Sequence, residues 1–160
     1  MEPRFVIKNH SDINYVIGYL NTNHAKAAGE GKPLVVLIAP QEKDRSKAQN
    51  RLYWMWMHQW SKKQGTDKDY EHLYFKKQFL SKIYDRDDVG QYKKTFEAVR
   101  GLRDSNHPAY QQVAEGLCEL MSTTDASTAQ FTEYLNDIHA FCLKQGCYLE
   151  TPDDLKYALE

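Results

Sequence analysis

The chain has 160 residues, a length that suits a single domain able to bury its own core. Its hydrophobic share of 41% and charged share of 27% are typical of a globular protein, and its net charge of −1 excludes a bulk polycation. The sequence has no run of about 18 apolar residues, so we expect no membrane span. Met1–Arg4 lacks the profile of a signal peptide, and three cysteines leave one unpaired under any single bridge, which favours a reducing cytoplasm.

Charge is distributed unevenly along the chain. Between residues 43 and 63, Asp44 is the one acid among six basic residues, which are Lys43, Arg45, Lys47, Arg51, Lys62 and Lys63. From residue 115 onward, nine acidic residues are opposed only by Lys144 and Lys156. A local basic segment on a nearly neutral protein predicts a confined polyanion site, and we do not expect the acidic end to touch nucleic acid.

The first forty residues predict two strands around a helix. Phe5–Lys8 is short and rich in residues that favour strands. Apolar residues then follow at helical spacing from Ile13 to Leu20, and the glycines from Gly29 onward end this helix. Leu34–Ile38 is a continuous apolar run between two prolines, which favours a strand covered on both faces.

The rest of the chain predicts helices. Apolar spacing and caps place them at about 46–63, 67–84, 91–103, 108–120 and 127–146, with a short one after Pro152. The expected fold class is therefore α+β and mostly helical, with a small N-terminal β-α-β unit followed by four to six helices. We expect one domain over 1–160, in which 1–64 is the β-α-β-α part with the binding motif and 65–160 is mainly helical.

The helix that begins near Ser46 has two different faces. On a helical wheel at about 100° per residue, the arc expected to face the core holds Ala48, Leu52, Met55, Trp56, Gln59 and Trp60. Trp54 falls well outside this arc, beside Lys47, Asn50, Arg51, His58 and Ser61. An indole on a polar face suits stacking on an unstacked base while neighbouring cations hold phosphates.

The first turn of the same helix adds further groups that suit nucleic acid. Arg45 and Gln49 lie four apart, where backbone N–H groups also favour an anion. Gln49 lies within the apolar arc, so its carboxamide needs a partner: the Arg45 side chain, a backbone group or a base edge. We expect Arg45, Lys47 and Arg51 to neutralise phosphates, Trp54 to stack on a base, and Gln49 and Asn50 to hydrogen-bond a base edge or sugar.

Other interpretations stay open. A basic helix face is often only solvated, and Trp54 can instead cover a subunit interface. Asp85, Asp87 and Asp88 are candidate Mg²⁺ ligands of a nuclease, but no partner acids or catalytic lysine are spaced around them. The set of His139, Cys142, Cys147 and Cys118 is a candidate zinc site, although a core stripe explains Cys142 better. The glycines near residue 30 lack the Walker spacing. We expect no metal, no cofactor and no catalysis.

The pattern Arg-Ser-x-x-Gln-Asn-x-x-x-Trp, here Arg45, Ser46, Gln49, Asn50 and Trp54, resembles the signature of the NinB family of phage recombination proteins, the lambda Orf type. Further similar residues follow in the family's order: Ser122, Thr123, Glu133, Ile138, Phe141, Gly146 and Pro152. The resemblance spans nearly the whole chain. The segment 85–106 departs from it, because it is longer and more helical than the β-hairpin-like stretch expected of the family.

The resemblance implies an intertwined homodimer that binds single-stranded DNA in preference to duplex. It also implies contact with the single-strand-binding protein (SSB) of a bacterial host and help in loading recombinase onto coated strands, in place of the host RecFOR proteins. In the family, the signature Gln and Trp are tied to DNA contact, which carries over to Gln49 and Trp54. We therefore expect a non-enzymatic recombination mediator. The alternatives are an SSB-binding adaptor without direct DNA contact and a metal-dependent nuclease.

Overall fold

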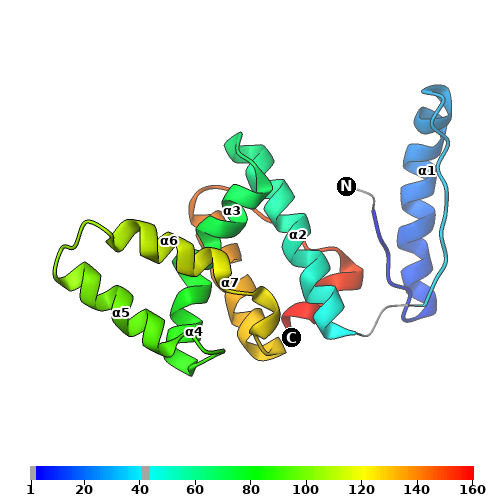
Figure 1. Ribbon diagram of the computed structural model, residues 1–160. Helices are drawn as coiled ribbons and strands as arrows, with labels where there is room; N and C mark the ends of the chain where they lie inside the picture. Colours follow the sequence, from blue (N-terminus) through cyan, green and yellow to red (C-terminus); the bar gives the residue numbers. More distant parts are fainter. Residues whose placement is uncertain (1–2, 41–43) are drawn as a thin grey trace.

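Helix α2 (Arg45–Gln64) is the element against which α3, α7 and the C-terminal turn pack. The computed structural model, drawn in Figure 1, describes residues 3–40 and 44–160. Lys43, which belongs to the basic segment of the sequence, lies outside the described residues, as do Met1 and Glu2. Asp44 caps the start of α2 by accepting a hydrogen bond from the Lys47 backbone N–H, and Gly65 ends the helix with a φ of 71°. The predicted helix near 46–63 is thus confirmed.

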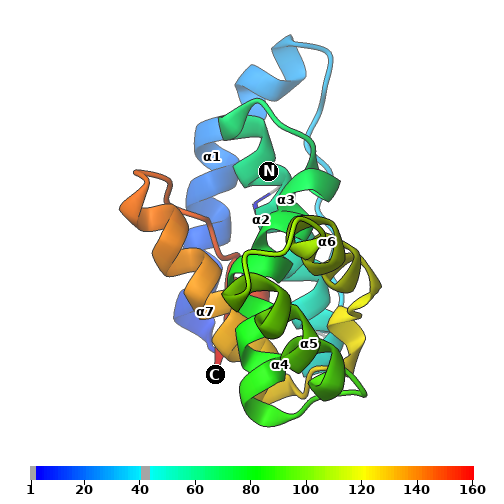
Figure 2. The same cartoon turned by 60° about the vertical axis from the view of Figure 1, so that its left-hand side comes forward.

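The remaining helices follow in the order that the sequence predicts. Their bounds are α3 (Lys68–Phe75), the π-helical turn η2 (Lys76–Leu80), α4 (Ser81–Asp87), α5 (Lys93–Asp104), α6 (Tyr110–Leu120), α7 (Thr128–Lys144) and the 3₁₀ helix η4 (Asp153–Leu159). Two further 3₁₀ turns are η1 (His10–Asp12) and η3 (Thr123–Asp125). Helices α5 and α6 form a pair at the end of the molecule far from α1, and this pair comes to the front in Figure 2. Within 85–106, α5 confirms the helical character expected of that segment.

The core lies between α2, α7 and the segments that pack on them. Helix α2 buries Ala48, Leu52, Tyr53, Trp56, Met57 and Trp60, and α7 buries Phe131, Tyr134, Leu135, Ile138 and Cys142. The buried face of α2 is wider than the wheel predicts, because α3, α7 and η4 all pack on this one helix. Tyr53 and Met57 are therefore buried, whereas Met55 and Gln59 are only half-buried.

The predicted N-terminal β-α-β unit is wrong. Neither 5–8 nor 34–38 forms a strand, and residues 3–40 and 44–160 contain no strand at all, so the described fold is all-helical rather than α+β. The mostly helical part of the prediction is confirmed. The predicted helix between the two runs does form, as α1 (Ile13–Gly29).

The predicted strands do not form because no other strand or helix of the described residues buries them. Helix α1 lies to one side of the other helices (Figure 1), and none of its residues is buried. A pair of short strands needs further strands or a packed helix for stability, and a continuous apolar strand needs cover on both faces. Within one chain, Leu34–Ile38 has neither, and Val35, Leu37 and Ile38 remain almost fully exposed. No helix in the described residues is both long enough and apolar enough to cross a membrane.

Candidate nucleic-acid interface

Trp54 belongs to α2, lies where α3 packs on this helix, and is half-buried. The ring of His72 packs on it at 5.0 Å between centroids with an interplanar angle of 31°, and Tyr53 meets it edge-on at 5.3 Å. The Lys68 ammonium lies 5.8 Å from the centroid of the indole, within the range of a cation–π contact. The indole is thus supported from α3 without being sealed into the core, as a stacking platform requires.

Two polar residues next to Trp54 on α2 are exposed. The Lys47 side chain is 72% exposed, with its ammonium 3.5 Å from the Asp44 carboxylate. Asn50 is exposed, and its side chain makes no hydrogen bond within residues 3–40 and 44–160. A surface ion pair of this kind contributes little to stability, so the Lys47 side chain can turn to a ligand. The Asn50 side chain is available as well, because it has no hydrogen bond to break within the described residues.

Arg51 is shared with the acidic C-terminal segment. Its guanidinium lies 3.4 Å from Oδ2 of Asp154, and the Arg4 guanidinium lies 3.0 Å from the same oxygen. Asp154 belongs to η4, which packs on the basic helix α2. The two oppositely charged parts of the sequence therefore meet in space, and part of the cationic charge at the interface is neutralised from within the protein.

Arg45 and Gln49 face the protein interior more than the solvent. Gln49 is 2% exposed, and its Nε2 donates to the carbonyls of Thr128 and Ala158 and to the Thr132 hydroxyl, at 2.8–3.0 Å. The Arg45 guanidinium donates to the Thr132 hydroxyl and to the Glu160 carbonyl. Of the partners that the sequence left open for Gln49, backbone groups are therefore present. These two signature residues join the start of α2 to α7 and to the end of the chain.

Two residues of α3, His72 and Lys68, lie against Trp54, and the sequence predicts neither contact. No spacing pattern connects them to Trp54, because the turn after Gly65 and the packing of α3 on α2 bring them there. Burial, and then the nearby Lys76 ammonium, lower the pKa of His72 to about 4 despite the opposing effect of Asp69. The ring beneath Trp54 is therefore neutral at physiological pH, with Nδ1 hydrogen-bonded to the Tyr53 hydroxyl at 2.6 Å.

The residues considered for metal-dependent chemistry have other partners. Asp85 pairs with Arg100, Asp87 with Arg86, and Asp88 with Lys93.

All three cysteines are buried and free, and burial raises the pKa of Cys142 to about 12, which disfavours the thiolate that zinc requires. Among the described residues, no group of three or more His, Cys, Asp or Glu side chains is placed to hold a metal ion.

Comparison of the chain with protein-family models, with curated proteins and with solved structures found no match.

Proposed function

We propose that this protein is a non-enzymatic, single-stranded DNA-binding recombination mediator. The observation that supports it best is the half-buried indole of Trp54, held against His72, with the cationic groups of Lys47, Arg51 and Lys68 on the two helices that meet there. Stacking platforms flanked by cations are the usual means of holding unpaired strands, and they tolerate any sequence because every base has a π-face.

Each residue at the Trp54 surface has a separate role in this proposal. Trp54 stacks on a base, Lys47 and Lys68 neutralise phosphates, and Asn50 hydrogen-bonds a base edge or sugar. Arg51 joins them when the strand displaces its contact with Asp154.

Gln49 and Arg45 take a different part, because Nε2 of Gln49 and one guanidinium nitrogen of Arg45 already donate to groups inside the protein. We assign them as positioning residues that fix the start of α2 beneath the strand.

The cellular role in the proposal comes from the NinB-family resemblance. The protein acts in the cytoplasm of a bacterial host on strands coated by SSB, and it helps recombinase to load. Three free, buried cysteines fit a reducing compartment.

The homodimer in the proposal has support of its own. Val35, Leu37 and Ile38 are 90%, 87% and 90% exposed, a contiguous apolar surface of the kind that marks protein contacts.

Fluorescence anisotropy with a labelled oligonucleotide in a salt series tests the DNA site. Trp54→Ala should lower affinity for single-stranded DNA by about 1–3 kcal/mol through lost stacking. Lys47→Ala should reduce the salt slope by about 0.7 through one lost phosphate contact. Tyr148→Ala is the matched control, because Tyr148 is an aromatic residue that is 65% exposed and lies beyond α7.

Wild-type affinity and salt slope in both variants would remove the assignment. Binding of an acidic peptide with the chemistry of an SSB tail, without binding of oligonucleotide at low salt, would replace the mediator with the adaptor.

A further inference from the structure

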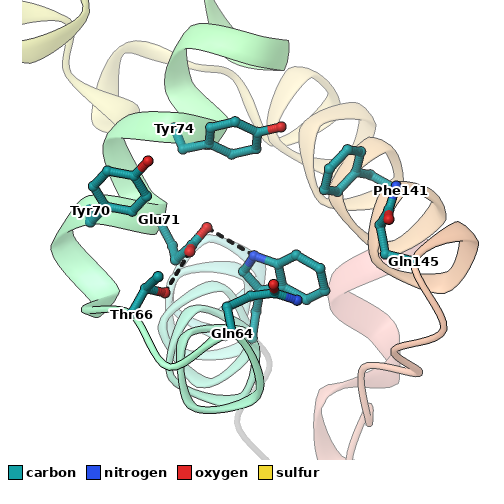
Figure 3. A pocket seen from close by; sticks show the side chains of 8 residues that line it. Gln64, Thr66, Tyr70, Glu71, Tyr74, Phe141 and Gln145 are labelled. Atoms are coloured by element: carbon teal, nitrogen blue, oxygen red, sulfur yellow. Dashed lines mark hydrogen bonds between the residues drawn. The ribbon is translucent and has the colours of Figure 1, made fainter.

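A hollow of about 650 Å³ opens between the end of α2, the start of α3 and the end of α7. Figure 3 shows it from close by, with Tyr70, Glu71 and Tyr74 on the α3 side and, facing them, Phe141 of α7 and Gln145 directly after this helix. It is separate from the Trp54 surface, although both involve α2. Trp60 of α2 and Thr66 of the turn that follows it also line the hollow.

The carboxylate of Glu71 is buried in this lining, with 4% of the residue exposed. Its Oε2 accepts a hydrogen bond from the Trp60 indole N–H at 2.9 Å, and its Oε1 accepts one from the Thr66 hydroxyl at 2.6 Å, as the dashed lines in Figure 3 mark. Both donors are neutral. Over residues 3–40 and 44–160, no Lys, Arg or His nitrogen lies within 4.0 Å of this carboxylate.

A buried carboxylate with only neutral donors is costly, because burial removes its hydration and no cation offsets the charge. An ionised carboxylate also has about four acceptor positions, of which the structure uses two. The carboxylate therefore has both an uncompensated charge and free hydrogen-bonding capacity.

Aromatic rings surround this group. The ring of Phe141 lies 6.0 Å from that of Tyr74 and 5.9 Å from that of Trp60, and Tyr70, which is 63% exposed, stands at the rim. Aromatic faces attract cations, and a guanidinium both stacks on such faces and donates in parallel to a carboxylate. A phosphate-bearing ligand is instead repelled by Glu71.

We infer that this hollow binds the guanidinium of an arginine side chain from a partner polypeptide, with Glu71 as its counter-ion and Tyr70 and Tyr74 as its aromatic walls. The inference stands apart from the proposed DNA site, because it concerns a ligand of opposite charge and different residues. It gives the protein a second contact surface, selective for a basic partner.

The test is an NMR titration that follows the Trp60 indole N–H signal, which reports on the hydrogen bond to Glu71. The probes are N-acetyl-arginine amide and its neutral isostere N-acetyl-citrulline amide. We expect a saturable shift with the arginine probe and at least a tenfold weaker response with citrulline. Glu71→Gln keeps a hydrogen-bonding side chain without the charge, and it should weaken arginine binding at least tenfold.

Tyr70→Ala changes only the exposed rim, so it tests the site even if Glu71→Gln fails to fold, and it should weaken binding several-fold. Tyr148→Ala, the control, should bind the arginine probe as the wild type does. Equal binding of both probes, no saturable shift, or unchanged binding in Tyr70→Ala would each overturn the inference. A saturable shift with uncharged cytidine that exceeds the shift with arginine would identify the hollow as a base pocket instead.

Discussion

His72 shows how one residue determines the state of the proposed stacking platform. Its ring lies under the indole of Trp54, and its Nδ1 is hydrogen-bonded to the Tyr53 hydroxyl, which in turn lies 3.2 Å from the Tyr134 hydroxyl. Burial and the Lys76 ammonium keep the pKa of His72 near 4 in the folded protein. In the unfolded chain the same group titrates near 6.5.

This difference predicts a pH dependence of stability. Between about pH 6.5 and 4 the unfolded chain binds a proton at His72 that the folded protein does not, so protons favour unfolding, and the stabilising contribution of neutral His72 is lost as the pH falls through this window. The carboxamide of His72→Gln can still hydrogen-bond the Tyr53 hydroxyl, as donor or acceptor, but it does not titrate. Urea unfolding at pH 7 and pH 5 should therefore show a smaller loss of stability for the variant than for the wild type. Equal losses in the two proteins would contradict this account.

At the scale of elements, the packing of η4 on α2 brings acidic residues to a basic surface. Asp154 contacts both Arg51 and Arg4, whereas its neighbour Asp153 pairs with Lys156 of the same short helix. In the proposed DNA complex, the C-terminal segment therefore competes with phosphate for Arg51, and the strand has to displace or share this contact.

Asp154→Asn should accordingly raise affinity for single-stranded DNA several-fold, because it releases Arg51 from its counter-ion. Asp153→Asn removes the same formal charge from the same element but leaves Arg51 paired, so it serves as the control. Anisotropy titrations at one low salt concentration compare the two. If both substitutions raise affinity equally, only the net charge matters and the local competition is absent.

Local signals in the sequence predict where helices begin and end better than they predict which elements pack on each other. Gly65 ends α2 as predicted, and the Ser127 capping box, with both of its hydrogen bonds present, starts α7. The buried stripe of α7 likewise follows from apolar spacing. The predicted strands failed because strand formation depends on distant cover, and Leu34–Ile38 has none within one chain.

Local signals in the sequence predict only part of the candidate site. The wheel identifies Trp54 as lying off the expected core arc, and the position of Gln49 indicates that its amide needs a partner. Neither the support of Trp54 by His72 nor the pairing of Arg51 with Asp154 can be inferred from spacing. Both contacts join residues far apart in the sequence through packing between elements.

At the scale of the whole molecule, the exposed apolar segment predicts self-association. In the proposed homodimer, residues 34–38 are covered by a second copy, so Leu37→Asp should shift the protein toward monomer by placing a charge in that contact. Leu120→Asp is the control, since Leu120 is 79% exposed on α6, far along the chain from this segment. Sedimentation equilibrium measures the mass of each. A monomeric wild type, or identical masses for all three proteins, would exclude this interface.

Trp54 and Trp60 stand six residues apart on α2, which separates them by about 9 Å along a single rigid rod. The Trp54 surface suits a polyanion and the hollow at Glu71 suits a cation. If both proposals hold, the same helix binds a nucleic-acid strand and a basic protein arm within about a nanometre of each other. Salt screens the exposed phosphate contacts more than a pair formed at the buried carboxylate of Glu71. A rise in ionic strength would therefore release the nucleic-acid strand before the basic arm.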